Sequence, residues 1–409
     1  MPDAKRKTPR RSRGRFLALI TGVGVGAQVP LVAALAQLSG HLLPVVALPA
    51  ALTVGFLLAL AGPRATLWSA PGRVRLYLVL WPFFIWWTTA LLFMLAAPLA
   101  LAARAAFGFS TERALAGAMG VAALGTGLAL RQRPRVRAAE VAIAGLPAAF
   151  DGLRIAQISD LHCGPFASAA RVERWVAAVN RLGPDLTAVT GDLIASGTAF
   201  VPVVAAALGK LRAPHGVFAC MGNHDYFTEG EEMAHALERA GLTLLRNRGV
   251  EVTRGEDAIY VAGVDDTWTR RDDLARTLAA RRPGTPALLL AHDPALFPEA
   301  AARGVDLTLS GHTHGGQLGV PMLAHRYNLA RFMTRFTTGF YRLGESVLYV
   351  NRGLGTTGPP IRLAVAPEIA FITLRRATPA SAARAGGSAG ASIDAEGGAD
   401  DFSVVPSST

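Results

Sequence analysis

The first third of the chain contains four long apolar runs, approximately Phe16 to Leu38, Leu42 to Ala61, Leu78 to Ala103 and Ala114 to Leu130. A helix needs about 20 apolar residues to cross a bilayer. The pattern therefore predicts an all-α membrane domain of about four transmembrane helices over residues 16–137. The fourth run carries the weakest signal, because it is short and rich in Gly and Ala. Tryptophans in the third run are typical of interfacial and lipid-facing positions: Trp81, Trp86 and Trp87.

From Leu153 onward the pattern changes to short apolar runs that alternate with amphipathic segments, which is typical of an α/β domain. Helices are expected at Ala170–Leu182 and Glu231–Ala240. Strands are expected at Leu153–Ser159, Leu186–Thr190, Val217–Met221, Leu242–Leu245, Ile259–Val264, Ala287–Ala291, Val305–Leu309, Val347–Val350 and Ile369–Leu374.

Charge separates the same two parts of the 409-residue chain, whose net charge is +12. Before residue 138 there are two acids, Asp3 and Glu112, against sixteen Lys and Arg, whereas residues 138–376 carry 24 basic and 23 acidic side chains. The nearly neutral second part has no interleaving of aromatic and basic residues, so no nucleic acid is expected as a partner. No acid lies inside a predicted span, which favours an anchor over a transporter.

The basic residues also indicate an orientation. They gather before the first run (Lys5 to Arg15), between the second and third (Arg64, Arg73 and Arg75) and after the fourth (Arg131 to Arg137). Basic flanks favour the cytoplasmic side, so an integral protein of a bacterial cell membrane is expected, with the α/β domain in the cytoplasm. Cleavage of a signal peptide near Ala34-Leu-Ala36 would leave three spans and the same final topology. If the fourth run does not span, the α/β domain lies outside.

Five of the nine histidines stand in or between short polar motifs, each directly after a predicted strand. The motifs are Asp160-Leu-His162, Gly191-Asp192, Gly222-Asn223-His224-Asp225, His292 and Gly311-His312-Thr-His314. Carboxylates, an amide and imidazoles suit Mn, Fe or Zn at a hydrolytic centre. Loops at the carboxyl ends of strands can converge on one crevice. Cys163 and Cys220 are too few for a disulfide framework and are expected to be small buried residues.

These motifs closely resemble the calcineurin-like metallophosphoesterases, and more narrowly their membrane-anchored members. The similarity runs from Leu153 to about Leu374 and is carried by Ile158–His162, Gly222–Tyr226, Gly263–Asp266, Leu309–Gln317 and Tyr349–Gly355. The resemblance implies a four-layer αββα sandwich with two divalent metal ions. Mn is the metal that the family suggests, and Fe, Zn or Co also suit the ligands.

The resemblance also implies a role for each polar residue. Asp160, His162 and His314 would hold one metal ion, and Asn223, His292 and His312 the other. Asp192 would bridge the two ions, a hydroxide held between them would attack phosphorus, and His224 would be the general acid. Strand alternation predicts that the side chains of an Asp-x-His segment point the same way. Asp225 is expected to support its loop.

One departure concerns the residues after Asp192. In the protein-phosphatase branch a second Asp and an Arg follow and assist the catalytic His, but here the chain continues with Ile194, Ala195 and Ser196. A phosphoprotein phosphatase is therefore disfavoured, and the group that assists His224 stays open.

The segment from Gly315 to Gly344 mixes apolar side chains with arginines, and it is a candidate lid that faces lipid. Its apolar members are Met322, Phe332, Met333, Phe336, Phe340 and Tyr341, and its basic members are Arg326, Arg331 and Arg335. Arginine binds phosphate oxygens in a fork, so the three are candidate substrate-binding residues. The alternative is that the aromatic residues are core and the arginines a solvated face.

The sequence thus predicts a basic tail (1–15), a transmembrane domain (16–137), a catalytic domain (138–376) and a disordered tail (377–409). The expected activity is hydrolysis of a phosphodiester or pyrophosphate bond. The expected partners are the bilayer and a phosphorylated lipid or nucleotide-lipid such as UDP-2,3-diacylglucosamine, a substrate linked to similar membrane-anchored proteins. The alternatives are a phosphatase or cyclic-nucleotide phosphodiesterase acting on soluble substrates, and a non-enzymatic membrane sensor. The sequence indicates no oligomeric state.

Overall fold

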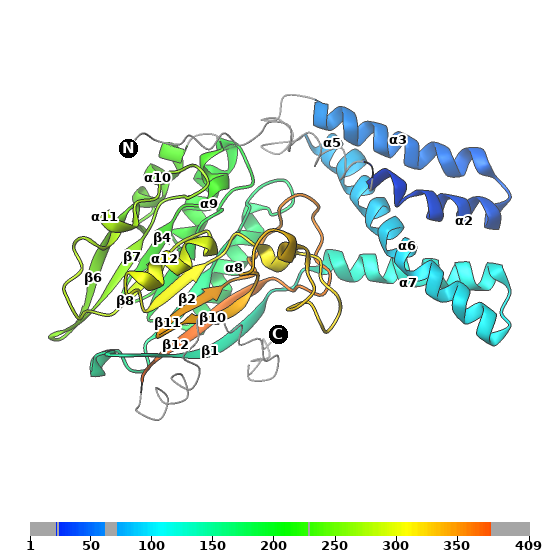
Figure 1. Ribbon diagram of the computed structural model, residues 1–409. Coiled ribbons are helices and arrows are strands. Elements are labelled where there is room, and N and C mark those ends of the chain that lie inside the picture. The colour runs from blue at the N-terminus through cyan, green and yellow to red at the C-terminus, as the bar shows by residue number, and fades with distance from the viewer. Residues whose placement is uncertain (1–21, 23, 62–71, 228–229, 378–409) are drawn as a thin grey trace, which may run out of the picture. The chain divides into compact units, whose positions relative to one another are not determined.

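The computed structural model describes residues 22, 24–61, 72–227 and 230–377. The chain forms two compact units (Figure 1). The helical unit comprises the described residues up to Arg131, and the α/β unit comprises those from Gln132. The expected tails, residues 1–15 and nearly all of 377–409, lie outside the described residues.

The helical unit consists of α2 (Val29–Ser39), α3 (Leu42–Ala61), α5 (Arg73–Arg75), η1 (Leu76–Leu80), α6 (Trp81–Phe107) and α7 (Thr111–Arg131). Among the described residues, three helices are long and apolar enough to cross a membrane, within Leu42–Ala59, Arg73–Phe107 and Thr111–Arg131. They correspond to the second, third and fourth apolar runs. The run from Phe16 is described only in part, where Gly24–Ser39 forms a shorter apolar helix.

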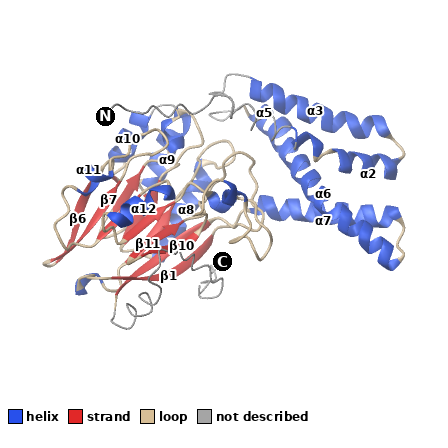
Figure 2. Cartoon of the chain, in the orientation of Figure 1, coloured by secondary structure: helices blue, strands red, loops and turns tan. Residues whose placement is uncertain are grey.

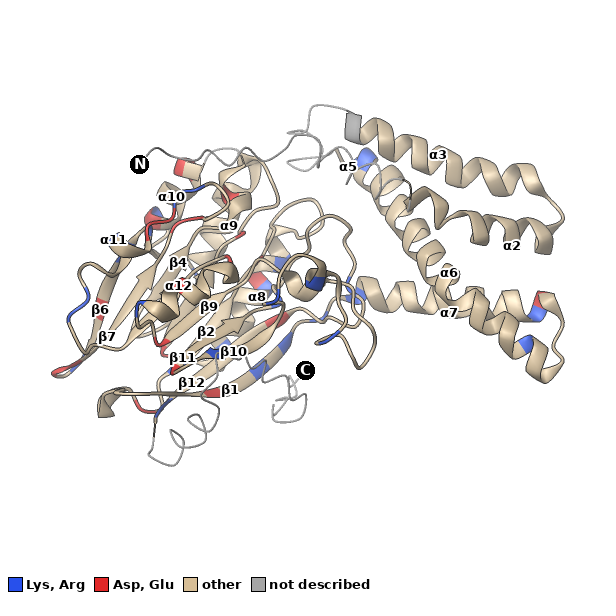
Figure 3. Ribbon diagram, in the orientation of Figure 1, with Lys and Arg blue, Asp and Glu red and all other residues tan. Residues whose placement is uncertain are grey.

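Among the described residues of the helical unit, the charged ones lie near the ends of the helices (Figure 3). Polar side chains inside the unit form hydrogen bonds with one another. The Trp86 indole donates to Gln28 Oε1 at 2.8 Å, and Thr53 Oγ1 donates to the same oxygen at 3.3 Å. Hydrogen bonds of this kind hold helices together where water is scarce. Trp86, expected at a lipid-facing or interfacial position, is therefore a partner within the helical unit.

The α/β unit is built on two six-stranded mixed sheets (Figure 2). The first has the order β1-β12-β2-β3-β4-β5 and the second β10-β11-β9-β8-β7-β6. Their bounds are β1 Arg135–Ile143, β2 Arg154–Ile158, β3 Leu186–Thr190, β4 Val217–Cys220, β5 Thr243–Leu244, β6 Arg248–Arg254, β7 Asp257–Gly263, β8 Ala287–Leu290, β9 Leu307–Ser310, β10 Gly339–Leu343, β11 Ser346–Val350 and β12 Glu368–Arg376.

Apolar side chains on the inner faces of both sheets form one buried cluster, which includes Ile155 of β2 and Leu288 of β8. The outer face of the first sheet packs against α8 (Ala169–Leu182), α9 (Val201–Leu208) and α10 (Gly230–Arg239). The second sheet is covered by α11 (Leu274–Leu278) and by α12 (Phe297–Ala302). The shorter helices are η2 Ala148–Phe150, η3 Thr198–Phe200, η4 Asn223–Tyr226, η5 Pro294–Leu296, η6 His314–Gly316 and η7 Leu329–Phe332. The α/β class is the one that the sequence predicts.

Strands β1, β6 and β10 are elements that the sequence pattern did not predict. β1 pairs in parallel with β12, and the expected domain boundary between residues 137 and 138 falls inside this strand. The sequence pattern places its arginines in the basic flank after the fourth apolar run. In the structure Arg137 forms an ion pair with Glu368 of β12, Nε to Oε2 at 3.1 Å. A strand at the edge of a sheet tolerates charged side chains, which conceals its apolar alternation.

We expect Glu368→Ala to destabilise the α/β unit by about 2–4 kcal/mol. Glu368 is 1% exposed, and its carboxylate accepts hydrogen bonds from Tyr349 Oη at 2.9 Å and from the Arg352 backbone at 3.0 Å, besides its ion pair with Arg137. The substitution leaves these donors without their acceptor. Denaturant unfolding of the detergent-solubilised chain measures the effect, with the exposed Glu345→Ala as the control. Equal midpoints for the two variants would contradict the prediction.

Candidate metal centre

Five strands bring the polar motifs to one edge of the sandwich. β2, β3 and β4 are parallel neighbours in the first sheet, and β8 and β9 are parallel neighbours in the second. The motifs follow the carboxyl ends of these strands: Asp160 and His162 after β2, Asp192 after β3, Asn223 and His224 after β4, His292 after β8, and His312 and His314 after β9. Residues from both sheets therefore meet at one place.

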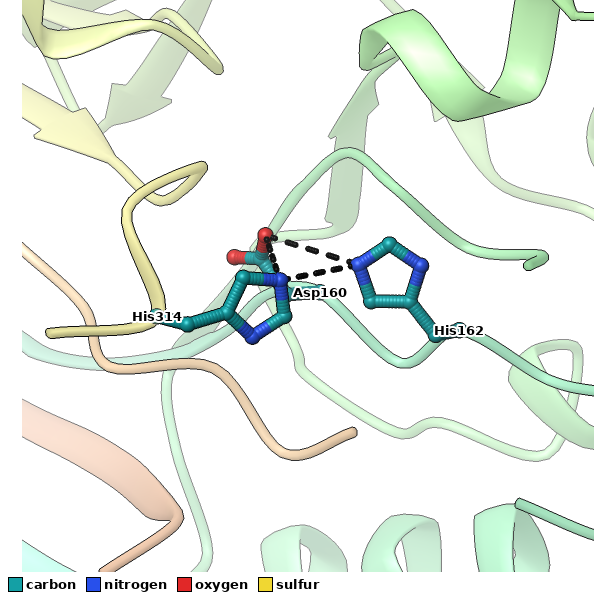
Figure 4. A group of neighbouring side chains, drawn as sticks. All are labelled: Asp160, His162 and His314. Carbon is teal, nitrogen blue, oxygen red and sulfur yellow. Dashed lines mark hydrogen bonds and ion pairs between the residues drawn. The ribbon is translucent and has the colours of Figure 1, made fainter. Parts of the chain in front are cut away.

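Asp160, His162 and His314 form the first ligand group, and their side chains point toward one another (Figure 4). His162 Nε2 lies 2.9 Å from His314 Nε2, and His314 Nε2 lies 3.3 Å from Asp160 Oδ1. All three residues are buried. Three ligand atoms thus face a common point, as a metal ion requires.

The second group contains Asp192, His292 and His312. His292 Nε2 lies 3.2 Å from Asp192 Oδ2 and 3.2 Å from His312 Nδ1. His292 Nδ1 donates to the Thr190 carbonyl at 2.7 Å, which leaves Nε2 as the ligand atom. Asp192 Oδ2 is also 3.6 Å from His162 Nε2 of the first group. Asp192 therefore stands between the two groups, where a bridging ligand would stand.

The backbone at the ligands is left-handed. Asp160, His162, Asp192, His312 and His314 have φ values of 52°, 43°, 54°, 70° and 52°. The strand-alternation argument for Asp160 and His162 is therefore wrong, because the chain is not extended there and a turn aims both side chains. Left-handed conformations of non-glycine residues cost free energy and are concentrated at functional sites.

Asn223 provides a test of whether a cation fits. Its side chain is 4% exposed, and Oδ1 finds no hydrogen-bond partner among the described residues. A buried amide oxygen without a donor costs free energy. A divalent cation held by this oxygen together with the second group would satisfy it, so the donor set fits the metal ions that the resemblance implies.

Burial controls the charge of the ligands. It lowers the pKa of His162 to about 3 and of His312 to about 4, so both imidazoles are neutral at physiological pH, the form that binds metal. Burial raises the pKa of Asp160 to about 6, although His292 opposes the shift. Burial disfavours the charged form of His292, but the charge and hydrogen bond of Asp192, the charge of Asp160 and the Thr190 carbonyl together raise the pKa of His292 well above its usual value. The two carboxylates thus favour positive charge at the site.

His224 is oriented by a backbone carbonyl. Its Nδ1 lies 2.8 Å from the Ala195 oxygen, and its backbone N–H donates to Asp192 Oδ1 at 2.9 Å. The ring centroid is 4.6 Å from that of His162. Ala195 is therefore a candidate for the group that assists His224, which the sequence left open, because its carbonyl is the partner of Nδ1.

Asp225 holds two ligand loops together. Its carboxylate accepts hydrogen bonds from the backbone of Leu193 at 2.8 Å, Ile194 at 3.3 Å and Gly222 at 3.0 Å. A Cβ on Gly222 would overlap the Asp192 carboxylate, so the loop after β4 must have glycine there. Asp225 is a supporting residue of the kind that the sequence indicated.

Arg362 belongs to the site although no sequence motif contains it. The side chain is 4% exposed, and it donates to the carbonyls of Arg352 at 2.8 Å and Gly353 at 3.2 Å. Its Nη2 also lies 3.2 Å from Nδ1 of His314. Burial lowers the pKa of Arg362 to about 10. An isolated arginine in a loop carries no signal of such a role, because only tertiary folding brings those carbonyls around it.

The candidate lid divides into core and exposed parts. Phe336 and Tyr341 are buried in a core cluster, whereas Met322, Phe332 and Met333 are 94%, 88% and 75% exposed. The arginines Arg326, Arg331 and Arg335 are exposed and contact none of the metal ligands through a described hydrogen bond or ion pair. We call Leu318–Arg335 the apolar loop. It starts shortly after His314, and beyond its far end the Thr337 carbonyl accepts Thr313 Oγ1 at 2.6 Å.

Other candidates have structural partners. Asn351 bonds to the backbone of Gln157 and Gly353, and Arg352 Nε donates to Thr338 at 2.8 Å. Cys163 and Cys220 are buried, and burial raises the pKa of the Cys163 thiol to about 12.

Comparison with known proteins identifies the family. The model of the calcineurin-like phosphoesterase family matches residues 153–316. The chain is 35% identical over 260 residues to the zebrafish (Danio rerio) "transmembrane protein with metallophosphoesterase domain", which covers 60% of this chain and 58% of that protein. It is 33% identical over 234 residues to metallophosphoesterase YkuE of Bacillus subtilis, a match that covers 56% of this chain and 82% of YkuE. It is 32% identical over 232 residues to a metallophosphoesterase of Aquifex aeolicus, a match that covers 54% of this chain and 85% of that protein.

The chain belongs to the calcineurin-like metallophosphoesterases. The matched part spans most of the two bacterial relatives but only 58% of the zebrafish protein. Members of this family use divalent metal ions, and the two ligand groups of this chain are candidate positions for them.

We expect Asp225→Asn to destabilise the α/β unit by about 1–3 kcal/mol, because one carboxylate acceptor becomes an NH₂ group that faces a backbone N–H. It should also weaken Mn²⁺ binding, since the loops that bear Asp192 and Asn223 lose their common anchor. Thermal unfolding with and without Mn²⁺ measures both effects. The exposed Asp272→Asn is the matched control. An unchanged transition in the Asp225 variant would show that the anchor is dispensable.

Proposed function

We propose that this chain is a membrane-anchored, metal-dependent hydrolase of a phosphodiester or pyrophosphate bond. The observation that carries the proposal is that Asp192 lies between two ligand groups and beside His224. When bound, two divalent cations supply positive charge that lowers the pKa of a water molecule and stabilises phosphoryl oxygens. Mn²⁺ is the proposed metal, with Fe, Zn and Co as alternatives.

The residues of the chain supply position and a proton. In this proposal Asp160, His162 and His314 bind one cation, Asn223, His292 and His312 bind the other, and Asp192 contacts both. In this proposal His224, whose Nδ1 is held by the Ala195 carbonyl, donates a proton from Nε2 to the leaving oxygen. A fixed ring avoids reorientation during the reaction, which is the advantage of a carbonyl partner.

The proposed substrate is a membrane lipid or lipid precursor such as UDP-2,3-diacylglucosamine. Two observations support it: the helical unit has three helices of membrane length, and the apolar loop beside His314 exposes Met322, Phe332 and Met333. Large apolar side chains are seldom exposed together unless they bind a partner. Flexible methionines suit acyl chains, and the exposed arginines of the same loop suit phosphate.

The proposed location is a bacterial cell membrane, with the α/β unit in the cytoplasm. The support is the distribution of Lys and Arg around the apolar runs. Arg135 and Arg137 belong to β1, so the basic residues that directly flank the end of α7 are Arg131 and Arg133. An even number of spans would place both basic ends on one side.

Two other functions keep specific support. The same ligand groups also suit a phosphatase or cyclic-nucleotide phosphodiesterase that acts on soluble substrates, and a membrane sensor would use the same ligands only to bind. Turnover separates the sensor from the enzymes, and a comparison of micellar lipid with a soluble diester separates the two kinds of substrate.

The detergent-solubilised chain should hydrolyse a chromogenic phosphodiester in the presence of Mn²⁺, faster than the corresponding monoester. EDTA and Asp192→Asn should abolish turnover, and His224→Ala should lower kcat by about 10²- to 10⁴-fold while Mn²⁺ stays bound. The exposed His235→Ala is the control. A folded, Mn²⁺-loaded chain that turns over neither the diester nor a micellar lipid would favour the sensor.

Replacing Arg326, Arg331 and Arg335 with Ala should reduce turnover of a micellar phospholipid diester by about tenfold or more and change turnover of a small soluble diester by less than about twofold. The physical reason is that these side chains are exposed on the apolar loop and apart from the metal ligands. A control triple substitution of the exposed Arg239, Arg276 and Arg303 removes the same charge elsewhere. An equal loss on both substrates would reject the lipid-selecting role.

A further inference from the structure

Two exposed aromatic side chains border the metal centre. Trp268 is 56% exposed and Phe227 is 54% exposed. The Trp268 ring centroid lies 4.9 Å from that of His312, and the Phe227 centroid lies 4.4 Å from that of His224. Neither aromatic residue belongs to a motif that the sequence singled out for substrate binding. Exposed apolar rings next to a candidate active site point to a ligand that covers them.

The two aromatic residues lie beside different histidines of the site. His224 lies in a third cluster with Asp192 and His162, and His312 belongs to the second ligand group with Asp192 and His292. Within each group the ligand atoms lie within 4.8 Å of one another. Phe227 and Trp268 therefore each lie next to a histidine that neighbours Asp192, the residue around which a phosphoryl group would be bound.

The Trp268 ring is held in place although more than half of the residue is exposed. Its indole N–H donates to Asp293 Oδ2 at 3.1 Å, and Thr267 Oγ1 donates to the same oxygen at 3.2 Å. The buried Asp266 accepts the backbone N–H of Thr269 at 2.7 Å, which closes the loop that carries the ring. Asp293 directly follows the candidate ligand His292. A rigid ring loses little entropy when another ring stacks on it.

We propose that Trp268 forms a stacking subsite for the base of a nucleotide whose phosphate lies at the metal centre. The inference rests on the proposed phosphate-binding function of that centre and names the substrate class more closely. A planar base matches a fixed indole face, because base–aromatic stacking needs no particular hydrogen-bonding pattern. An acyl chain is matched better by the flexible, more exposed methionines of the apolar loop. Together, the Trp268 ring and the apolar loop suit a nucleotide-linked lipid.

A pair of ligands that differ only in the base tests the proposal. We would measure binding of adenosine 5′-monophosphate and of ribose 5-phosphate to the full-length, Mn²⁺-loaded chain in detergent by isothermal titration calorimetry. The nucleotide should bind about tenfold or more tightly than ribose 5-phosphate. Trp268→Ala should remove most of this advantage and leave ribose 5-phosphate affinity within about twofold, while Trp268→Phe should keep most of it.

Phe332→Ala is the matched control, because it removes an exposed aromatic side chain of the same unit that lies on the apolar loop. Equal affinity of the wild-type chain for the two ligands would overturn the stacking subsite and leave the phosphate site intact. A uniform loss of both affinities in Trp268→Ala would also overturn it, since the residue would then support the fold. If neither ligand binds to the folded, Mn²⁺-loaded chain, the proposed phosphate site and the stacking subsite both fail.

Discussion

The burial of two carboxylates, Asp160 and Asp192, at the seam between two sheets is the constraint on which the α/β unit depends. A buried charge is costly unless opposite charge and hydrogen-bond donors surround it. Imidazoles and backbone N–H groups around the two residues meet that need. The need of buried polar groups for hydrogen-bond partners also joins the sheets. The buried Gln157 of β2 donates to Thr190 of β3 and to the Ser310 carbonyl of β9, both at 3.0 Å.

The loops that carry the ligands are stable because residues behind them fix the backbone. Asp225 joins the loops after β3 and β4 through hydrogen bonds. Arg362 donates to the carbonyls of Arg352 and Gly353 and lies next to Nδ1 of His314. Left-handed conformations at the ligands store free energy that these contacts must offset. The surrounding fold holds a site assembled from five strand ends in this way, and preorganisation of this kind lowers the free-energy cost of binding.

Two kinds of surface adjoin the ligands. Trp268 is a ring fixed by Asp293, whereas Met322 and Phe332 stand almost wholly exposed on a long loop that returns beside His314. The first surface is rigid and planar, and the second is apolar and adaptable. Reaction type and substrate choice are therefore separate properties of this chain: the ligands and His224 provide the proposed reaction, and these surfaces provide the selectivity that we propose.

The sequence by itself determined the alternation of strands and helices, the three membrane-length helices that the structure describes and the residues that meet at the metal centre. Periodicity and motif spacing depend on residues that are close together in the chain, so they can be recognised from the sequence alone. It did not reveal β1, whose charged residues conceal an edge strand, or the turn that aims Asp160 and His162. Nor did it reveal that Ala195 orients His224, that Arg362 supports His314 or that Phe336 is core while Phe332 is exposed. Those outcomes depend on contacts between residues that are far apart in the chain, and only the tertiary structure decides which backbone group, ion pair or solvent each side chain meets.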